Sequence, residues 1–146
     1  MSLRAMIVGM LLLSAVGARA DRVADLVVTL REGQADQRRD AAYELGEMGL
    51  AARSTVPDLI AQLRDQHWHE RGSVLSALVK IAPEDPAVMK ALEEASLEPD
   101  KNVREALGYA LQTAPRAVLK RALPILERLV GDKEWTVSNP ALEAVG

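Results

Sequence analysis

The sequence predicts an all-α fold in which pairs of helices repeat four times along the chain. The 146 residues are 49% hydrophobic but only 3% aromatic, with no Phe, so Ala and Leu supply the core. Such a core suits closely packed helices better than a β-sandwich. A nine-residue pattern also recurs at steps of 33, 33 and 34 residues, at 37–45 (QRRDAAYEL), 70–78 (ERGSVLSAL), 103–111 (VREALGYAL) and 137–145 (VSNPALEAV). Even spacing of this size is typical of stacked repeats, so we predict an α-solenoid (an α-α superhelix).

The first twenty residues have the three parts of a secretory signal peptide. Arg4 gives a positive start, residues 5–16 form an apolar run of 12 residues, and residues 18–20 read Ala-Arg-Ala, the form of a cleavage site. The apolar run is short for a bilayer span, although an uncleaved membrane anchor is the alternative. We expect cleavage after Ala20, which would make the mature protein secreted or periplasmic.

The charge of the chain argues against one class of partner. Without the leader, 16 basic and 21 acidic residues remain, a net charge of −5. An acidic domain is a poor candidate for binding a phosphate backbone, so we expect no nucleic-acid partner. The chain has no Cys, which excludes disulfides and lipid attachment at an N-terminal Cys. Stability must therefore come from helix packing.

The repeat domain spans residues 21–146, with repeats at about 21–49, 50–82, 83–114 and 115–146. In the first repeat, the sequence Glu-Gly-Gln at 32–34 separates the two helices. We expect Asp36 to cap the second helix, which then runs to Met48 and ends at Gly49.

Proline and acidic residues mark the middle repeats. Pro57 falls in an early helical turn, and Asp85-Pro86 has the form of an N-cap followed by proline at the first helical position. Residues 65–67 and 98–100 are the expected turns inside these repeats. The second helices of the first three repeats carry an equivalent leucine, and we predict that each is buried between neighbouring repeats: Leu45, Leu78 and Leu111.

The fourth repeat is less regular. Pro124 falls inside its apolar stripe and should kink the first helix or mark its restart. The second helix is expected to begin near Trp135 or Val137, with Asn139 as its cap. Apolar side chains at its end still need partners. This end is therefore part of a longer array, frayed, or covered by a partner.

The repeats resemble HEAT repeats, in particular the short bacterial repeats of phycobilisome-lyase-like proteins. Residues 56–63 (VPDLIAQL) and 123–129 (LPILERL) are similar to the family's first helix. Residues 98–111 are similar to its turn and second helix, and residues 38–49 to its ending. The fourth copy departs from the pattern, because Ser138 stands where the other copies have Arg.

The resemblance implies a scaffold that binds other proteins along a curved face lined by the second helices. A minority of such arrays handle bilin chromophores, which leaves an accessory enzyme or a chromophore-handling protein as an alternative. A structural spacer is a third reading. Fold resemblance supports function only by analogy.

Three arginines recur at equivalent positions, Arg38, Arg71 and Arg104. They are either a row of cations for an acidic partner or an internal ladder in which each hydrogen-bonds a turn carboxylate such as Asp65 or Asp100. We favour the ladder, because a structural role explains the recurrence in successive repeats.

A second equivalent position holds Tyr43, Ser76 and Tyr109. By helical phase these residues lie off the apolar stripe, so the tyrosines are candidate anchors for a protein partner, although single exposed aromatics also occur by chance. Arg39 and Glu105 border them and give the face mixed charge. Two repeats would place the rings roughly 20 Å apart, which suits a protein surface or an extended peptide.

Two other groups are weaker candidates. Trp68 and Trp135 begin equivalent helices and form either an edge patch or a packing over their own loops. Metal-ligand chemistry gathers only at Asp65, His67, His69 and Glu70. The histidines are two residues apart, a spacing that does not converge on a helix. We therefore expect no metal and no other cofactor, and the sequence contains no catalytic motif.

Overall fold

A computed structural model describes residues 3–64 and 68–146, with side chains described for residue 10, residues 12–64 and residues 71–146. Within these residues all regular elements are helices. In chain order they are α1 (Leu3–Glu32), α2 (Ala35–Met48), the 3₁₀ helix η1 (Gly49–Thr55), α3 (Val56–Gln62), α4 (Trp68–Ile81), α5 (Pro86–Ser96), α6 (Lys101–Gln112), α7 (Arg116–Arg121), α8 (Leu123–Val130) and α9 (Trp135–Val145).

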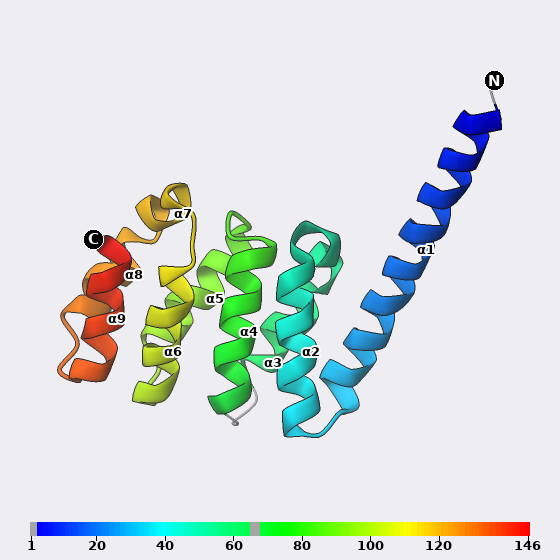
Figure 1. Ribbon diagram of the computed structural model, residues 1–146. Coiled ribbons are helices and arrows are strands. Elements are labelled where there is room, and N and C mark those ends of the chain that lie inside the picture. Colours follow the sequence, from blue (N-terminus) through cyan, green and yellow to red (C-terminus); the bar gives the residue numbers. More distant parts are fainter. Residues whose placement is uncertain (1–2, 65–67) are drawn as a thin grey trace.

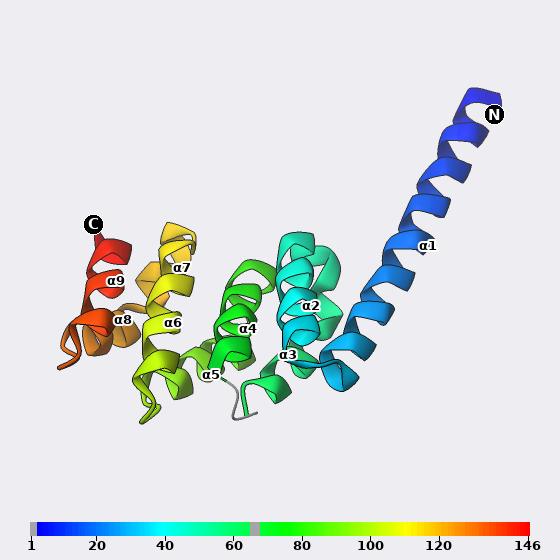
Figure 2. The same ribbon diagram turned by 60° about the horizontal axis from the view of Figure 1, so that its bottom comes forward.

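The helices form two layers that follow one another along a stack (Figures 1 and 2). Helices α2, α4, α6 and α9 lie side by side in one layer, and α3, α5 and α8 lie in the layer behind it. The second half of α1 packs beside α2, while its first half extends away from the stack (Figure 1). This arrangement is that of an α-solenoid, so the predicted fold class is confirmed at that level.

Local turn chemistry sets most of the helix ends. Asp85 and Asp100 cap α5 and α6, since their carboxylates accept hydrogen bonds from the N–H groups of Ala87 and Asn102, both at 2.9 Å. Such caps satisfy backbone donors that a helix start would otherwise leave unpaired. Gly49 ends α2 with φ of 56°, a left-handed conformation that favours glycine.

Two of the predicted caps are wrong. Helix α2 begins at Ala35 with Gln34 as its N-cap, and the N–H of Gln34 donates to Oε1 of Gln37 at 2.9 Å. Asp36 therefore lies inside the first turn. Helix α9 begins at Trp135, so Asn139 lies inside the helix.

Pro124 marks a restart of the helix. Helix α7 ends at Arg121, the backbone at Ala122 leaves the helical region with φ of −87° and ψ of 7°, and α8 begins at Leu123. Proline then occupies the first turn of α8, where its missing N–H removes no intrahelical bond. The predicted break is thus confirmed, in the form of two short helices.

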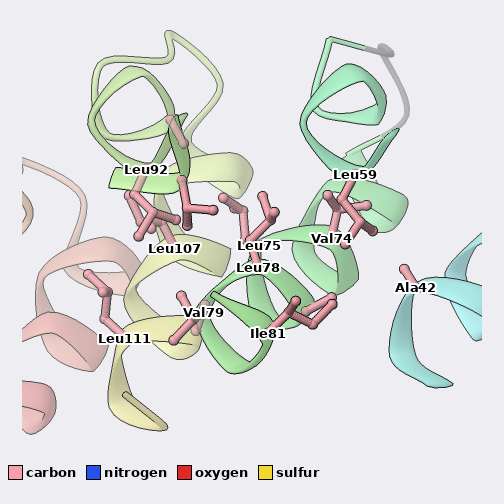
Figure 3. Packing of buried hydrophobic residues seen from close by; sticks show 14 of the residues in the cluster. Ala42, Leu59, Val74, Leu75, Leu78, Val79, Ile81, Leu92, Leu107 and Leu111 are labelled. Atoms are coloured by element: carbon pink, nitrogen blue, oxygen red, sulfur yellow. The ribbon is translucent and has the colours of Figure 1, made fainter. Parts of the chain in front are cut away.

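The core is a continuous apolar cluster between the two layers. Leu45, Leu78 and Leu111 are each 0% exposed, as predicted. Figure 3 shows Leu78 of α4 in the same cluster as Leu92 of α5 and Leu107 of α6, two further side chains that are 0% exposed. Each repeated leucine thus joins its own helix pair to its neighbour, as the register predicted.

Glycine permits close contact where helices of the front layer pack. A Cβ atom added at Gly46 of α2 would lie 3.1 Å from Cα of Ala77 in α4. One added at Gly108 of α6 would lie 3.1 Å from Cγ of Pro140 in α9. Distances this short are tighter than ordinary van der Waals contact, so these helices pack more closely than larger side chains would allow.

The predicted leader belongs to a longer helix. Helix α1 runs without interruption from Leu3, through the expected cleavage site, to Glu32. The side chains of Met10, Leu12, Leu13 and Val16 are 63–77% exposed. Of the helices in the described ranges, none combines the length and the apolar character that a membrane crossing requires.

Candidate protein-binding groove

An open groove of about 350 Å³ crosses the layer formed by α2, α4 and α6. Its lining comes from all three helices: Tyr43, Gly72, Ser73, Ser76, Ala77, Lys80, Ala106, Tyr109 and Thr113. The repeat places these residues together, because the same face of each helix points to the same side of the stack.

The three residues that the sequence singled out by their equivalent position line this groove together. Tyr43 lies on α2, Ser76 on α4 and Tyr109 on α6. Tyr43 is 63% exposed and Tyr109 is 53% exposed, while Ser76 is half-buried between them. Large exposed aromatic rings on either side of a groove are typical anchors for a protein partner.

The floor of the groove is made of small residues. Gly72 and Ala77 of α4 and Ala106 of α6 lie among the hydroxyl-bearing side chains. A Cβ atom at Gly72 would lie 3.3 Å from the Cβ of Ala106, so α4 and α6 approach closely here. A floor without long side chains leaves room for a partner's backbone between the tyrosines.

Sequence reasoning missed Lys80, which supplies the charge inside the groove. Its Nζ atom lies 2.5 Å from Oε1 of Glu47 and 5.5 Å from the centre of the Tyr43 ring. Both distances are those of favourable interactions, an ion pair and a cation–π contact. Lys80 stands 33 residues after Glu47, one period of the repeat, and that spacing is the signal that could have revealed the pair.

The two charged residues expected to border the tyrosines lie outside the lining of the groove. Arg39 of α2 hydrogen-bonds Asp36 at 2.9 Å and Asp40 at 3.1 Å, and the bond to Asp40 raises the pKa of its guanidinium. Glu105 lies one helical turn before Tyr109 on α6 and is partly exposed. Arg39 is therefore neutralised on its own helix.

Arg104 joins two neighbouring helix pairs. Its Nε donates to Oδ2 of Asp132 at 2.6 Å, and its Nη1 donates to the carbonyls of Glu98 and Pro99 at 2.7 and 2.9 Å. The two charged side chains are only 12% and 11% exposed. The hydrogen bond from Arg104 lowers the pKa of the Asp132 carboxyl, more than burial raises it. This contact fastens α6 to the turn before α9.

The carboxylate of this bridge is Asp132, whereas the sequence suggested Asp100. Asp100 instead caps α6. Nη1 of Arg71 lies 3.9 Å from Oε2 of Glu98, which is again an acidic residue of the following repeat. Arg38 is half-buried on α2, and Asp65, its expected partner, falls outside the described residues.

The remaining candidates are only partly covered by the structure. Trp135 is 73% exposed at the start of α9, away from the groove, and the side chain of Trp68 is not described. The proposed metal cluster falls mainly outside the described residues, because Asp65, His67 and the side chains of His69 and Glu70 are among those left out. Elsewhere in the described part of the chain, no group of three potential ligands could hold a metal ion.

Comparison with known proteins supports the architecture. No match was found among curated proteins. A family model described as HEAT repeats matches residues 23–112, more than half of the chain and the whole of the groove apart from Thr113. This match, together with the two-layer helical stack, shows that the chain belongs to the HEAT-repeat family.

Proposed function

We propose that the protein is an exported scaffold of four HEAT repeats that binds another protein through the groove across α2, α4 and α6. HEAT repeats commonly serve as protein-interaction scaffolds. The groove adds a specific surface to that general role, and no catalytic constellation competes with it among the described residues.

The pair of exposed tyrosines carries this proposal. Tyr43 and Tyr109 keep more than half of their surface exposed, although both belong to helices that pack closely with their neighbours. Burying two such rings would contribute strongly to association, because aromatic anchors dominate the energetics of protein interfaces. An open groove spanning three helices also suits an extended protein segment better than an enclosed small molecule.

Site-specific photo-crosslinking provides the most direct test. A photoreactive amino acid at Ser76, between the tyrosines, should crosslink to a partner in the extracytoplasmic fraction. The matched position is Lys90 of α5, whose side chain is 77% exposed in the other layer. Equal labelling from both positions, or none from Ser76, would contradict the assigned surface.

The captured partner then permits a comparison of variants. We expect Tyr43→Ala combined with Tyr109→Ala to weaken binding by 10-fold or more, since hot-spot residues each contribute about 2 kcal/mol or more. Trp135→Ala is the control, because it removes an equally exposed aromatic ring outside the groove. Circular dichroism must remain native in each variant. A normal affinity for the tyrosine variant would refute the role of the rings.

Export is a separate part of the proposal. It rests on the leader-like sequence, and the expected mature form begins at Asp21. N-terminal sequencing or the intact mass of the protein from the extracytoplasmic fraction decides this point. A soluble cytosolic product that retains Met1 would disprove export without affecting the groove.

The finer resemblance to phycobilisome-lyase-like repeats leads to a different outcome in the same experiments. A chromophore-handling protein would carry visible absorbance after purification or after mixing with a bilin, whereas a protein scaffold would not. A purely structural spacer would show neither absorbance nor crosslinking at Ser76.

A further inference from the structure

We infer that Tyr109 and Glu105 form a binding site for a Lys or Arg side chain, and that the groove therefore takes an extended basic protein segment. This inference rests on the proposed function and names the chemistry of the partner. It follows from a comparison of the two ends of the groove.

The α2 end of the groove contains such a site with its cation already in place. Tyr43 and Glu47 are one turn apart on α2, so the ring and the carboxylate lie on the same face. The ammonium group of Lys80 lies between them, 5.5 Å from the ring centre and 2.5 Å from the carboxylate. The fold thus supplies an internal example of a cation held by a tyrosine and a glutamate.

The α6 end has the same two groups without the cation. Tyr109 and Glu105 are also one turn apart, in the opposite order along the helix. The position equivalent to Lys80, one period later, holds Thr113, whose hydroxyl donates to the carbonyl of Ala110 at 2.9 Å. In the ranges 3–64 and 68–146, no cation lies over the Tyr109 ring and none pairs with Glu105.

The surrounding charges favour a basic occupant. The cations at the α2 end are already matched, Arg39 by Asp36 and Asp40, and Lys80 by Glu47. At the α6 end Glu105 is left with an unbalanced negative charge, and the chain as a whole is acidic. A positive side chain from a partner would gain a carboxylate and an aromatic face together.

The geometry between the two ends accounts for the extended form of the partner. The small floor residues of α4 lie between the occupied site and the open one. A strand-like segment can follow this floor while one basic side chain reaches Tyr109. A folded surface would meet the exposed tyrosines first.

The test uses the complete chain and a fluorescein-labelled peptide of alternating Ala and Lys, ten residues long, followed by anisotropy in 0.15 M salt. A peptide of alternating Ala and Glu is the charge-reversed probe. We expect the basic peptide to bind and the acidic peptide not to bind. Equal binding of both peptides, or no binding of the basic one, would overturn the inference.

Variants at the α6 end separate this site from general charge attraction. We expect Tyr109→Leu to raise the Kd of the basic peptide by about 2- to 30-fold, the range of a cation–π contact, and Tyr109→Phe to leave it unchanged. Glu105→Gln should also raise the Kd. The matched control Glu93→Gln removes the same charge from an exposed position on α5. Equal effects of the two Glu→Gln changes would show diffuse attraction and refute the site.

Lys80→Met gives a test in the opposite direction. Removing the internal cation frees Tyr43 and Glu47, so this variant should bind the basic peptide more tightly than the unmodified chain. Unchanged or weaker binding would contradict the idea that Lys80 occupies an equivalent site.

These results are independent of the crosslinking experiment. If Ser76 crosslinks to a partner whose captured segment lacks Lys and Arg, the inferred chemistry fails while the protein-binding function stands. If Ser76 captures nothing, the proposed function itself fails.

Discussion

The interior of the stack and its last helix pair use the same repeat position in opposite ways. Leu45, Leu78 and Leu111 are each 0% exposed, whereas Val145, the equivalent residue of α9, is 57% exposed. Leu142 of the same helix is 54% exposed, although its counterpart in α6 is the buried Gly108. The pattern of the sequence is the same in all four helices, and only the presence of a neighbouring helix pair differs.

This comparison teaches that burial in a stacked fold belongs to the contact between units. An apolar residue contributes to stability only where the next pair covers it, because the hydrophobic term scales with area removed from water. The repeat register alone therefore does not determine which leucine or valine stabilises the chain.

The largest expected effect comes from shortening a covered residue. Leu78→Ala should lower the free energy of unfolding by about 2–5 kcal/mol, as is usual when a buried leucine leaves a cavity. Val145→Ala at the equivalent exposed position should change it by less than about 0.5 kcal/mol. Urea unfolding followed by circular dichroism measures both.

Glu94→Ala is a surface control, since its side chain is 62% exposed on α5. A loss for Leu78→Ala no larger than that for Glu94→Ala would mean that the register is misassigned. A large loss for Val145→Ala would mean that another unit covers α9 in solution.

A smaller effect is expected from the bridge between α6 and the last pair. Arg104→Met should lower the free energy of unfolding by about 1–3 kcal/mol, because it leaves the Asp132 carboxylate and two carbonyls without their donor. The control is Lys101→Met, which removes a 49% exposed cation lying 3.9 Å from Glu134. Its expected change is within about 0.5 kcal/mol. Equal losses in thermal unfolding would show that the bridge adds nothing specific.

The smallest effect is a dependence on pH. The bond from Arg104 lowers the pKa of Asp132 in the folded chain, so the folded state binds this proton less readily than the unfolded state. The resulting stabilisation is fully present above the unfolded pKa, near pH 4, and is lost as the pH falls through the folded pKa. Asp132→Asn should therefore flatten the acid limb of the stability curve. An unchanged acid limb would contradict the assignment.

Local sequence signals were sufficient for much of the fold. Asp85-Pro86, Gly49 and Pro124 mark helix ends through backbone chemistry that acts within a few residues. The errors at Asp36 and Asn139 arose because a good capping residue also fits inside a first turn or on an exposed helix face. There the neighbouring helices, and not the local sequence, decide where the helix begins.

The site was predictable only in part for the same reason. The equivalent positions of Tyr43 and Tyr109 follow from the repeat and helical phase, which the chain itself displays. Lys80 and Asp132 act on residues 28–37 positions earlier in the chain, so their roles depend on how successive helix pairs are placed in space. A search for recurring acid–base offsets close to one period would have found both.

The pairing of Arg104 with an acid of the following repeat has a consequence for chain length. Deleting residues 72–104 would remove one full period and put Arg71 directly before Glu105, in the place of Arg104. The acid at Asp132 would then meet an equivalent arginine, so the joint between units would survive the loss of a unit. The groove would not, because Ser76 and Lys80 lie within the deleted stretch. Changes in the number of repeats can therefore preserve a folded array while erasing its recognition surface.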